Sequence, residues 1–174
     1  NTITQRHLGN LWVSLRTERV DWVRSFLDAQ GQVALATVLA QINHRETKSE
    51  DTLEREYDII KCIKAVVNFK EGADLALQTA KTVPALVGSL NSPRLMTRKL
   101  VTDVLTFLAH WQSPVGYHQV LSAFDTIKAQ TGDIGRFESW MRGVEDTLDG
   151  RGRMGSLVGA SDELRTGGVG MENL

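Results

Sequence analysis

The chain has 174 residues, of which 41% are hydrophobic and 24% charged, and its formal net charge is −1. That length predicts one domain with enough chain to bury a sizeable core. A charge so close to zero gives no electrostatic reason to expect nucleic acid or an anionic membrane as the main partner. The single cysteine, Cys62, excludes an internal disulfide and a multi-cysteine metal site, and it fits a reducing compartment.

The N-terminal residues contain neither the apolar core of a signal peptide nor a starting methionine, so we expect a fragment of a longer protein. No run of about 18 apolar residues occurs, and no transmembrane segment is therefore predicted.

Apolar residues recur at helical spacing along most of the chain, without the sustained alternation that is typical of strands. About nine helices and no strand are predicted. Pro84, Pro93 and Pro114 each follow a serine or threonine within two positions and open an apolar stripe. A proline in the first turn loses no intrahelical hydrogen bond, so all three positions favour helix starts. The predicted helical stripes cover residues 8–15, 23–27, 35–42, 53–67, 73–78, 86–90, 100–108, 117–124 and 137–148.

Two segments differ from this helical pattern. Residues 46–56 are polar and rich in acidic side chains, and we expect a solvated loop that runs into a helix start. The alternative is an acidic surface that pairs with a basic stretch of a partner. From Gly150 glycines become frequent, which predicts a flexible tail or linker, with one short helical turn at Ser161–Leu164.

Three segments share one plan, in which an apolar helix, a glycine and a second apolar helix follow one another. Equivalent positions are Leu35, Leu86 and Val120, at spacings of 51 and 34 residues. These spacings bracket the roughly 40–47 residues of armadillo and HEAT repeats. We therefore predict an all-α, armadillo-like helical repeat superhelix, with a plain helical bundle as the alternative. Such a stack presents an extended concave surface to partners.

The sequence offers no catalytic, metal or cofactor site. Cys62 stands in a strongly apolar helix, where a thiol is expected to be buried and inert. The four histidines have no zinc-ligand spacing, and no phosphate-binding glycine loop is present. Trp12, Trp22 and Trp140 are expected in the core. An enzyme is therefore not predicted, and a binding module is favoured.

Two stretches resemble one known family. Residues 11–27, LWVSLRTERVDWVRSFL, combine leucine, valine-x-leucine, four polar residues and tryptophan-valine-x-x-phenylalanine. Residues 59–72, IIKCIKAVVNFKEG, match a second motif position by position. In this order both are similar to the N-terminal regulatory region of diaphanous-related formins, with a tail that suggests fungal members. The resemblance implies that residues 1–22 end the GTPase-binding region, 23–149 form armadillo-like repeats and 150–174 form a glycine-rich tail.

The resemblance also implies a function. In the family this domain binds a short amphipathic helix near the protein's own C-terminus and holds the actin-assembling domain inactive. A GTP-loaded Rho-type GTPase then displaces that helix. Actin is reached only indirectly, through other domains, and no cofactor is needed. The implied place of action is the cytoplasm, at the cytoskeleton and cell cortex of polarity or division sites.

The family motif assigns binding of the autoregulatory helix first to Lys64 and Asn68. They are four positions apart and share a helix face, where Asn68 can hydrogen-bond the bound helix and Lys64 can meet its acidic side chains. The alternative role of Asn68 is to cap its own helix. By the same resemblance a second helix lines the groove with Phe107, His110 and Trp111. The alternative for the aromatic residues Phe107 and Trp111 is a position in the core.

The GTPase contacts implied by the resemblance lie at the N-terminal end. They are Val13 and the turn of Arg16, Thr17 and Glu18. Other family members carry more asparagine in this turn, so the sequence does not indicate which Rho-type GTPase binds. The remaining alternative for the whole chain is an unrelated armadillo or HEAT adaptor that holds a different helical peptide or partner protein.

Overall fold

The computed structural model describes residues 4–155, with the backbone alone for residues 149–155. Within residues 4–155 the chain forms nine α-helices, one 3-10 helix and no strand, which confirms the all-α, armadillo-like class. None of these helices is long and apolar enough to span a bilayer. The chain divides into two compact units, residues 1–127 and 128–174, and the boundary falls inside α8 (Val115–Thr131).

Unit 1 contains two successive three-helix repeats, preceded by α1 (Gln5–Thr17). The first repeat consists of α2 (Val20–Asp28), α3 (Gly31–Asn43) and α4 (Glu50–Val67). The second consists of α5 (Lys70–Gln78), α6 (Thr82–Gly88) with the 3-10 helix η1 (Ser89–Asn91), and α7 (Leu95–His110). The structural repeat thus begins at Val20 and again at Lys70, so α4 closes the first repeat and does not open the second.

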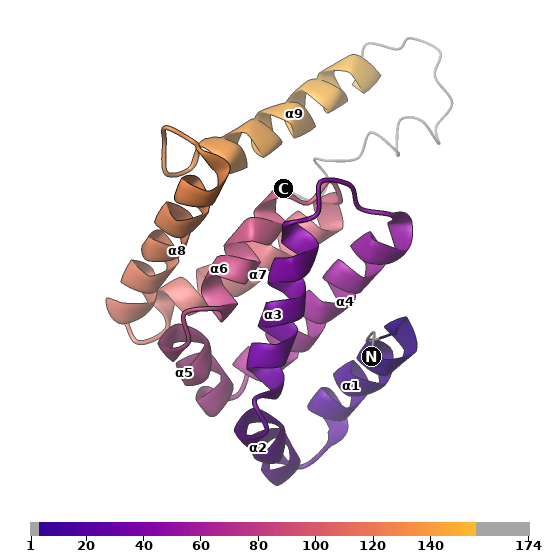
Figure 1. Ribbon diagram of the computed structural model, residues 1–174, viewed down its shortest axis with the longest axis vertical. Coiled ribbons are helices and arrows are strands. Elements are labelled where there is room, and N and C mark those ends of the chain that lie inside the picture. Colours follow the sequence, from indigo (N-terminus) through magenta and orange to yellow (C-terminus); the bar gives the residue numbers. More distant parts are fainter. Residues whose placement is uncertain (1–3, 156–174) are drawn as a thin grey trace. The chain divides into compact units, whose positions relative to one another are not determined.

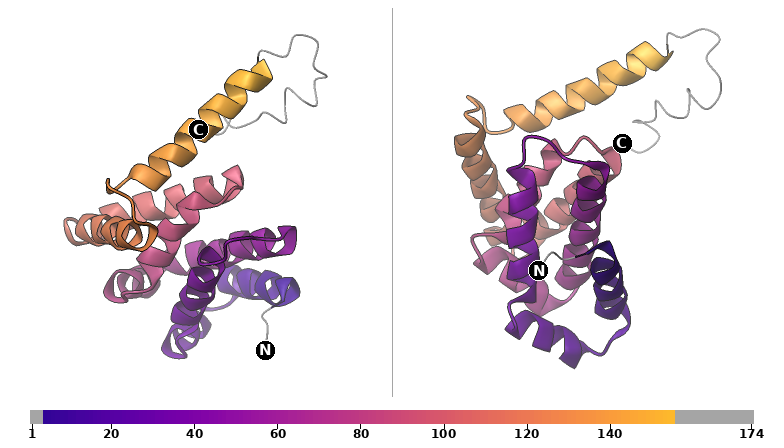
Figure 2. Two further views of the ribbon diagram at one scale, coloured as in Figure 1. Left: turned by 45° about the horizontal axis from the view of Figure 1, so that its top comes forward. Right: turned by 45° about the vertical axis from the view of Figure 1, so that its right-hand side comes forward.

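Equivalent helices of the two repeats stack on each other. α3 packs on α6, and α4 lies between α1 and α7 (Figure 1). These helices form two layers, α3 with α6 and α1 with α4 and α7, while the nine-residue helices α2 and α5 lie at one end of them (Figures 1 and 2). We call the exposed surface of the second layer the α1–α4–α7 face.

The sequence of α4 explains why this central helix forms. Ser49 is its N-cap, and the Ser49 Oγ accepts a hydrogen bond from the Thr52 backbone N–H at 3.3 Å. Acidic residues occupy the first turn and Lys64 the last, which matches the helix dipole. The core side is almost fully buried, and each such aliphatic side chain contributes roughly 1.5–3 kcal/mol. It includes Ile59, Ile60, Ile63, Val66 and Val67.

The glycines between the paired helices of the predicted repeat, Gly31, Gly72 and Gly116, all lie within helices, and at Gly72 and Gly116 the backbones of successive helices approach closely. A Cβ at Gly72 would lie 2.2 Å from the Val66 carbonyl oxygen. A Cβ at Gly116 would lie 2.0 Å from the Leu108 carbonyl oxygen. At both positions a new helix starts against the C-terminal end of the preceding long helix, so only a residue without Cβ fits.

The predicted solvated loop at residues 46–56 is wrong for most of its length. α4 begins at Glu50, and Glu56 is fully buried. Lys48 Nζ donates to Glu56 Oε1 at 2.9 Å, and the buried Ser92 hydroxyl donates to Oε2 at 2.8 Å. A carboxylate is stable at such depth because it has charged and hydrogen-bonding partners. Glu56 is a charged residue in a segment rich in acidic side chains, so the sequence pattern alone did not indicate burial.

The expected core position is also wrong for Trp22, whose side chain is 38% exposed. Helix α2 turns Val23 and Leu27 to the core, and the neighbouring Trp22 falls beside that stripe. Its ring stacks on Phe26, with centroids 6.0 Å apart and planes inclined by 7°. Trp12 and Trp140 are half-buried.

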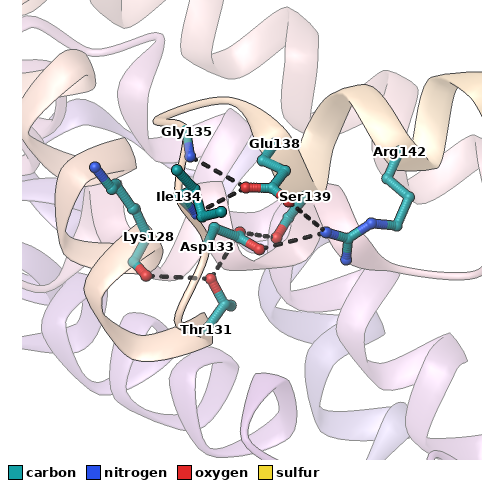
Figure 3. A network of polar contacts seen from close by, with 8 residues as sticks. All are labelled: Lys128, Thr131, Asp133, Ile134, Gly135, Glu138, Ser139 and Arg142. Carbon is teal, nitrogen blue, oxygen red and sulfur yellow. Dashed lines mark hydrogen bonds and ion pairs between the residues drawn. The ribbon is translucent and has the colours of Figure 1, made fainter.

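In unit 2, α9 (Glu138–Gly155) follows a compact polar turn, shown in Figure 3. The Asp133 carboxylate accepts from the hydroxyls of Thr131, at 2.7 Å, and Ser139. Glu138 Oε2 accepts from the backbone N–H groups of Ile134 and Gly135, at 2.7 and 3.1 Å. These bonds satisfy donors around the start of α9.

The predicted glycine-rich tail begins at Gly150, but α9 continues past it to Gly155. The predicted turn at Ser161–Leu164, and the rest of the tail, lie outside the described residues.

Candidate partner-binding site

A pocket of about 420 Å³ opens on the α1–α4–α7 face, between α1 and α4. Its floor is apolar, with buried Leu15 and Ala65. Its rim carries three cations and an amide on consecutive turns of the two helices. The lining residues are Trp12, Leu15, Arg16, Lys61, Lys64, Ala65, Asn68 and Phe69. The pocket can therefore take an apolar side chain beneath an acidic one.

Aromatic rings hold two of the three cations. The Arg16 guanidinium lies over the Trp12 ring, 4.6 Å from its centroid. Lys61 Nζ lies 4.8 Å from the same centroid and 5.4 Å from that of Tyr57, and it pairs with Asp58 at 2.8 Å. Cation–π contacts of this kind fix the position of flexible side chains. No carboxylate among the described residues pairs with Arg16.

Lys64 and Asn68, both predicted from the sequence, line this pocket together. Lys64 Nζ lies 3.1 Å from Asp103 Oδ2 of α7. Asn68 occupies the C-cap position of α4, yet its exposed side-chain amide makes no hydrogen bond within the described residues. Asn68 therefore occupies the C-cap position, as the alternative expected, but its side-chain amide does not cap the helix and is free to bind a partner.

The predicted residues on α7 continue the same face. Asp103, which contacts Lys64, precedes Phe107 by one turn, so the two side chains share a helix side. Phe107 is 38% exposed and its ring lies 5.5 Å from that of Trp111. His110 is exposed, and its Nδ1 lies 2.8 Å from the Thr106 carbonyl oxygen.

Trp111 differs from the other predicted groove residues. It is half-buried, and its Nε1–H donates to Asp74 Oδ1 of α5 at 2.8 Å. That bond anchors the indole inside the second repeat. Trp111 thus supports the Phe107 ring and has less free surface than Phe107 to offer a partner.

The predicted GTPase contacts separate into two places. Val13 is 51% exposed, and Thr17 and Glu18 are also exposed at the end of α1. The Thr17 hydroxyl donates to the Val13 carbonyl oxygen at 2.9 Å, so these residues follow one side of the helix. Arg16 instead belongs to the pocket with Lys64 and Asn68.

Sequence reasoning missed several residues of the site, among them Trp12, Lys61 and Asp103. Trp12 was assigned to the core, and Lys61 and Asp103 were not singled out. The spacing of Lys61, Lys64 and Asn68, at three and four positions, is a one-face pattern that could have revealed Lys61. Nothing local to α7 indicates that Asp103 faces Lys64.

Nucleophilic or metal chemistry finds little support in the described residues. Cys62 is fully buried with its thiol 3.5 Å from the Leu8 carbonyl oxygen, and burial raises its pKa to about 12. A thiol that remains protonated at neutral pH is a poor nucleophile. No group of three metal-ligating side chains occurs in the part of the chain that the structure describes.

Comparison with known protein families gives a match over more than half of the chain. Residues 1–110 match the family described as the Diaphanous GTPase-binding Domain. The chain belongs to this family. The match includes the pocket, the exposed end of α1 and α7 as far as His110. It confirms the resemblance to the regulatory region of diaphanous-related formins.

Several fungal proteins are similar to the diaphanous-type chain. Cytokinesis protein sepA of Emericella nidulans is 53% identical over 182 residues, which cover 100% of this chain and 10% of the relative. Protein BNI1 of Saccharomyces cerevisiae is 32% identical, over 95% of this chain and 10% of the relative. Formin BNR1 of Candida albicans is 34% identical, over 77% and 9%. The chain thus spans about one tenth of the length of these relatives.

Proposed function

We propose that this diaphanous-type GTPase-binding domain is the autoinhibitory domain of an actin-nucleating formin. In this proposal it binds the formin's own C-terminal autoregulatory helix, and a GTP-loaded Rho-type GTPase releases that helix. The observation that carries the proposal is the pocket between α1 and α4, in which Arg16, Lys64 and the unbonded amide of Asn68 surround an apolar floor.

An amphipathic helix with acidic residues suits this surface chemically. Helix-in-groove recognition uses apolar anchors for affinity and a few polar groups for register. Leu15 and Ala65 offer an apolar floor, and the exposed ring of Phe107 offers a second anchor point on α7. The three cations of the pocket favour carboxylates next to the anchors, and Asn68 can bond the backbone or a polar side chain.

The proposed GTPase contacts adjoin the pocket. Val13, Thr17 and Glu18 are exposed, and Arg16 precedes Thr17 directly while its guanidinium lines the pocket. A GTPase on this end of α1 would therefore act within one helical turn of a residue that the autoregulatory helix also uses. Closeness of the two surfaces supports displacement as the mode of release.

We also propose where the complete protein acts. Relatives of the chain include proteins named for cytokinesis and cell fusion. By that similarity the parent formin acts in the cytoplasm, on the cytoskeleton and cell cortex at polarity or division sites. Actin is then a partner of other parts of the protein, and this chain reaches it only through them.

Calorimetric titration with the purified C-terminal region of the parent formin tests the proposal. The unmodified chain should bind, while Lys64→Asp and Asn68→Asp should weaken binding about tenfold or more, because each sets a carboxylate against the acidic ligand. Lys81→Asp and Asn91→Asp are matched controls, since both residues are exposed and neither lines the pocket. Unchanged binding by both pocket variants would contradict the proposed groove.

Nucleotide dependence tests the GTPase part. A Rho-type GTPase loaded with a non-hydrolysable GTP analogue should compete with the C-terminal region, and the same GTPase loaded with GDP should not. A helical-repeat adaptor unrelated to formins would show neither competition nor any dependence on the nucleotide.

A further inference from the structure

Lys64 already has an acidic neighbour before any ligand arrives. Its Nζ lies 3.1 Å from Asp103 Oδ2, and the two residues come from α4 and α7, which lie side by side (Figure 1). The two side chains are 42% and 54% exposed. The lysine that the proposed function assigns to an acidic side chain of the ligand is therefore partly neutralised within the domain itself.

The Lys64–Asp103 pair distinguishes Lys64 from the other two cations of the pocket. Lys61 pairs with Asp58 on its own helix, and both side chains are less exposed, at 28% and 17%. Arg16 has no carboxylate partner among the described residues and rests on Trp12. Asp103 is thus the carboxylate that reaches a pocket cation from a different helix, and it lies on the side of α7 that also carries Phe107.

We propose that Asp103 is an internal competitor for Lys64, which lowers the affinity of the α1–α4–α7 face for its acidic helical ligand and so keeps that ligand displaceable. The inference rests on the proposed function, because it assumes that the ligand of this face carries carboxylates. It adds to that function a specificity-determining residue and the direction in which this residue acts.

Simple electrostatics supports competition over cooperation. An exposed ion pair changes an equilibrium constant by no more than about fivefold, so Lys64 can exchange Asp103 for a ligand carboxylate at little cost. The charge of Asp103 remains nearby after the exchange and repels the carboxylate that replaced it. Removing that charge should therefore tighten binding. A ligand with lysine or arginine opposite Asp103 escapes the repulsion, which makes Asp103 selective as well.

The test is the Asp103→Asn variant of the complete chain, titrated with the C-terminal region of the parent formin. Asparagine keeps the size of the exposed side chain, and thermal unfolding should be unchanged. Binding should become about two- to fivefold tighter at about 0.1 M salt. The gain should vanish near 1 M salt, where the Debye length falls to about 3 Å.

Two controls separate competition from general effects. Glu71→Gln removes the carboxylate of another exposed interhelical ion pair, Arg24–Glu71 at 2.9 Å, and should leave binding unchanged. A C-terminal region whose autoregulatory Asp and Glu residues are replaced by Asn and Gln should bind Asp103→Asn and the unmodified chain equally well.

Unchanged or weaker binding by Asp103→Asn, or a gain that persists with the amide-substituted ligand, would overturn the inference alone. If neither the unmodified chain nor Asp103→Asn bound the C-terminal region, the proposed function and the inference would fail together.

Discussion

Arg16 and Lys64 line the same pocket although 48 positions separate them in the chain. The family motif assigns the first to the GTPase and the second to the autoregulatory helix. The geometry instead groups both with Asn68, above the apolar floor between α1 and α4. Within the proposed function, Arg16 is therefore placed to contact the autoregulatory helix, next to the turn proposed for the GTPase.

Replacing Arg16 should weaken binding of the C-terminal region of the parent formin. Arg16→Gln removes a guanidinium that no carboxylate of the described residues neutralises, and we expect binding of the C-terminal region to weaken about fivefold, or by about 1 kcal/mol. Arg19→Gln is the matched control, because Arg19 is 89% exposed and does not line the pocket. Calorimetry measures both, and an equal loss in the two variants would speak against a pocket role for Arg16.

A charged substitution at Val13 should weaken binding of the GTPase and leave binding of the C-terminal region unchanged. Its side chain is 51% exposed on α1 and lies outside the pocket, so Val13→Asp should leave the fold intact. A carboxylate in an apolar contact should weaken binding of the GTP-loaded GTPase at least tenfold while the affinity for the C-terminal region stays constant. Loss of both activities would indicate one merged surface in place of two adjoining ones.

The buried carboxylate of Glu56 should be important for stability. Glu56→Gln replaces charge-assisted hydrogen bonds with Lys48 and Ser92 by neutral ones, and the free energy of unfolding should fall by about 1.5–3 kcal/mol. Glu46→Gln changes an exposed residue of the same segment and should stay within about 0.5 kcal/mol of the unmodified chain. Urea unfolding distinguishes the two, and equal stabilities would mean that the buried network contributes nothing.

The glycines should respond in opposite directions to the same substitution. At Gly72 a Cβ would lie 2.2 Å from the Val66 carbonyl oxygen, so Gly72→Ala should destabilise unit 1 by about 1–3 kcal/mol. At Gly9, inside α1, nothing lies within 4 Å of a new Cβ, and Gly9→Ala should stabilise the chain by about 0.5–1 kcal/mol. Thermal unfolding checks both, and a stabilised Gly72→Ala would contradict the close approach of α5 to α4.

The turn before α9 should loosen in acid. Hydrogen bonds from Ser139 and Thr131 lower the pKa of Asp133, and backbone N–H groups of Gly135 and Ile134 lower that of Glu138. Because the folded pKa values lie below the unfolded ones, which are about 4, the stabilisation is complete above that pH. It is lost as the pH falls through the lowered values.

NMR titration of the Ile134 and Gly135 amides from neutral to strongly acidic pH measures this transition. The midpoints should lie below the ordinary carboxylate range, and Glu138→Gln should reduce the titration shifts of both amides to the part that comes from Asp133, whereas Glu145→Gln should leave them unchanged. Midpoints at the ordinary value would show that the carboxylates do not hold the turn in solution.

By itself the sequence determined the helical class, the approximate positions of the helices and the family. It did so because helical periodicity, caps and motif residues depend on neighbours within about four positions. Lys64 and Asn68 could be placed on one face for the same reason, and their shared pocket bears this out.

Only the tertiary structure decided which helices meet. It buried Glu56 against Lys48 and Ser92, left Trp22 exposed, moved Arg16 into the pocket and set Asp103 against Lys64. These relationships depend on how α1, α4 and α7 pack, on which side α2 turns to the core, or on a loop folded back on a helix. Such contacts join residues far apart in the chain, and no local pattern of charge or hydrophobicity encodes them.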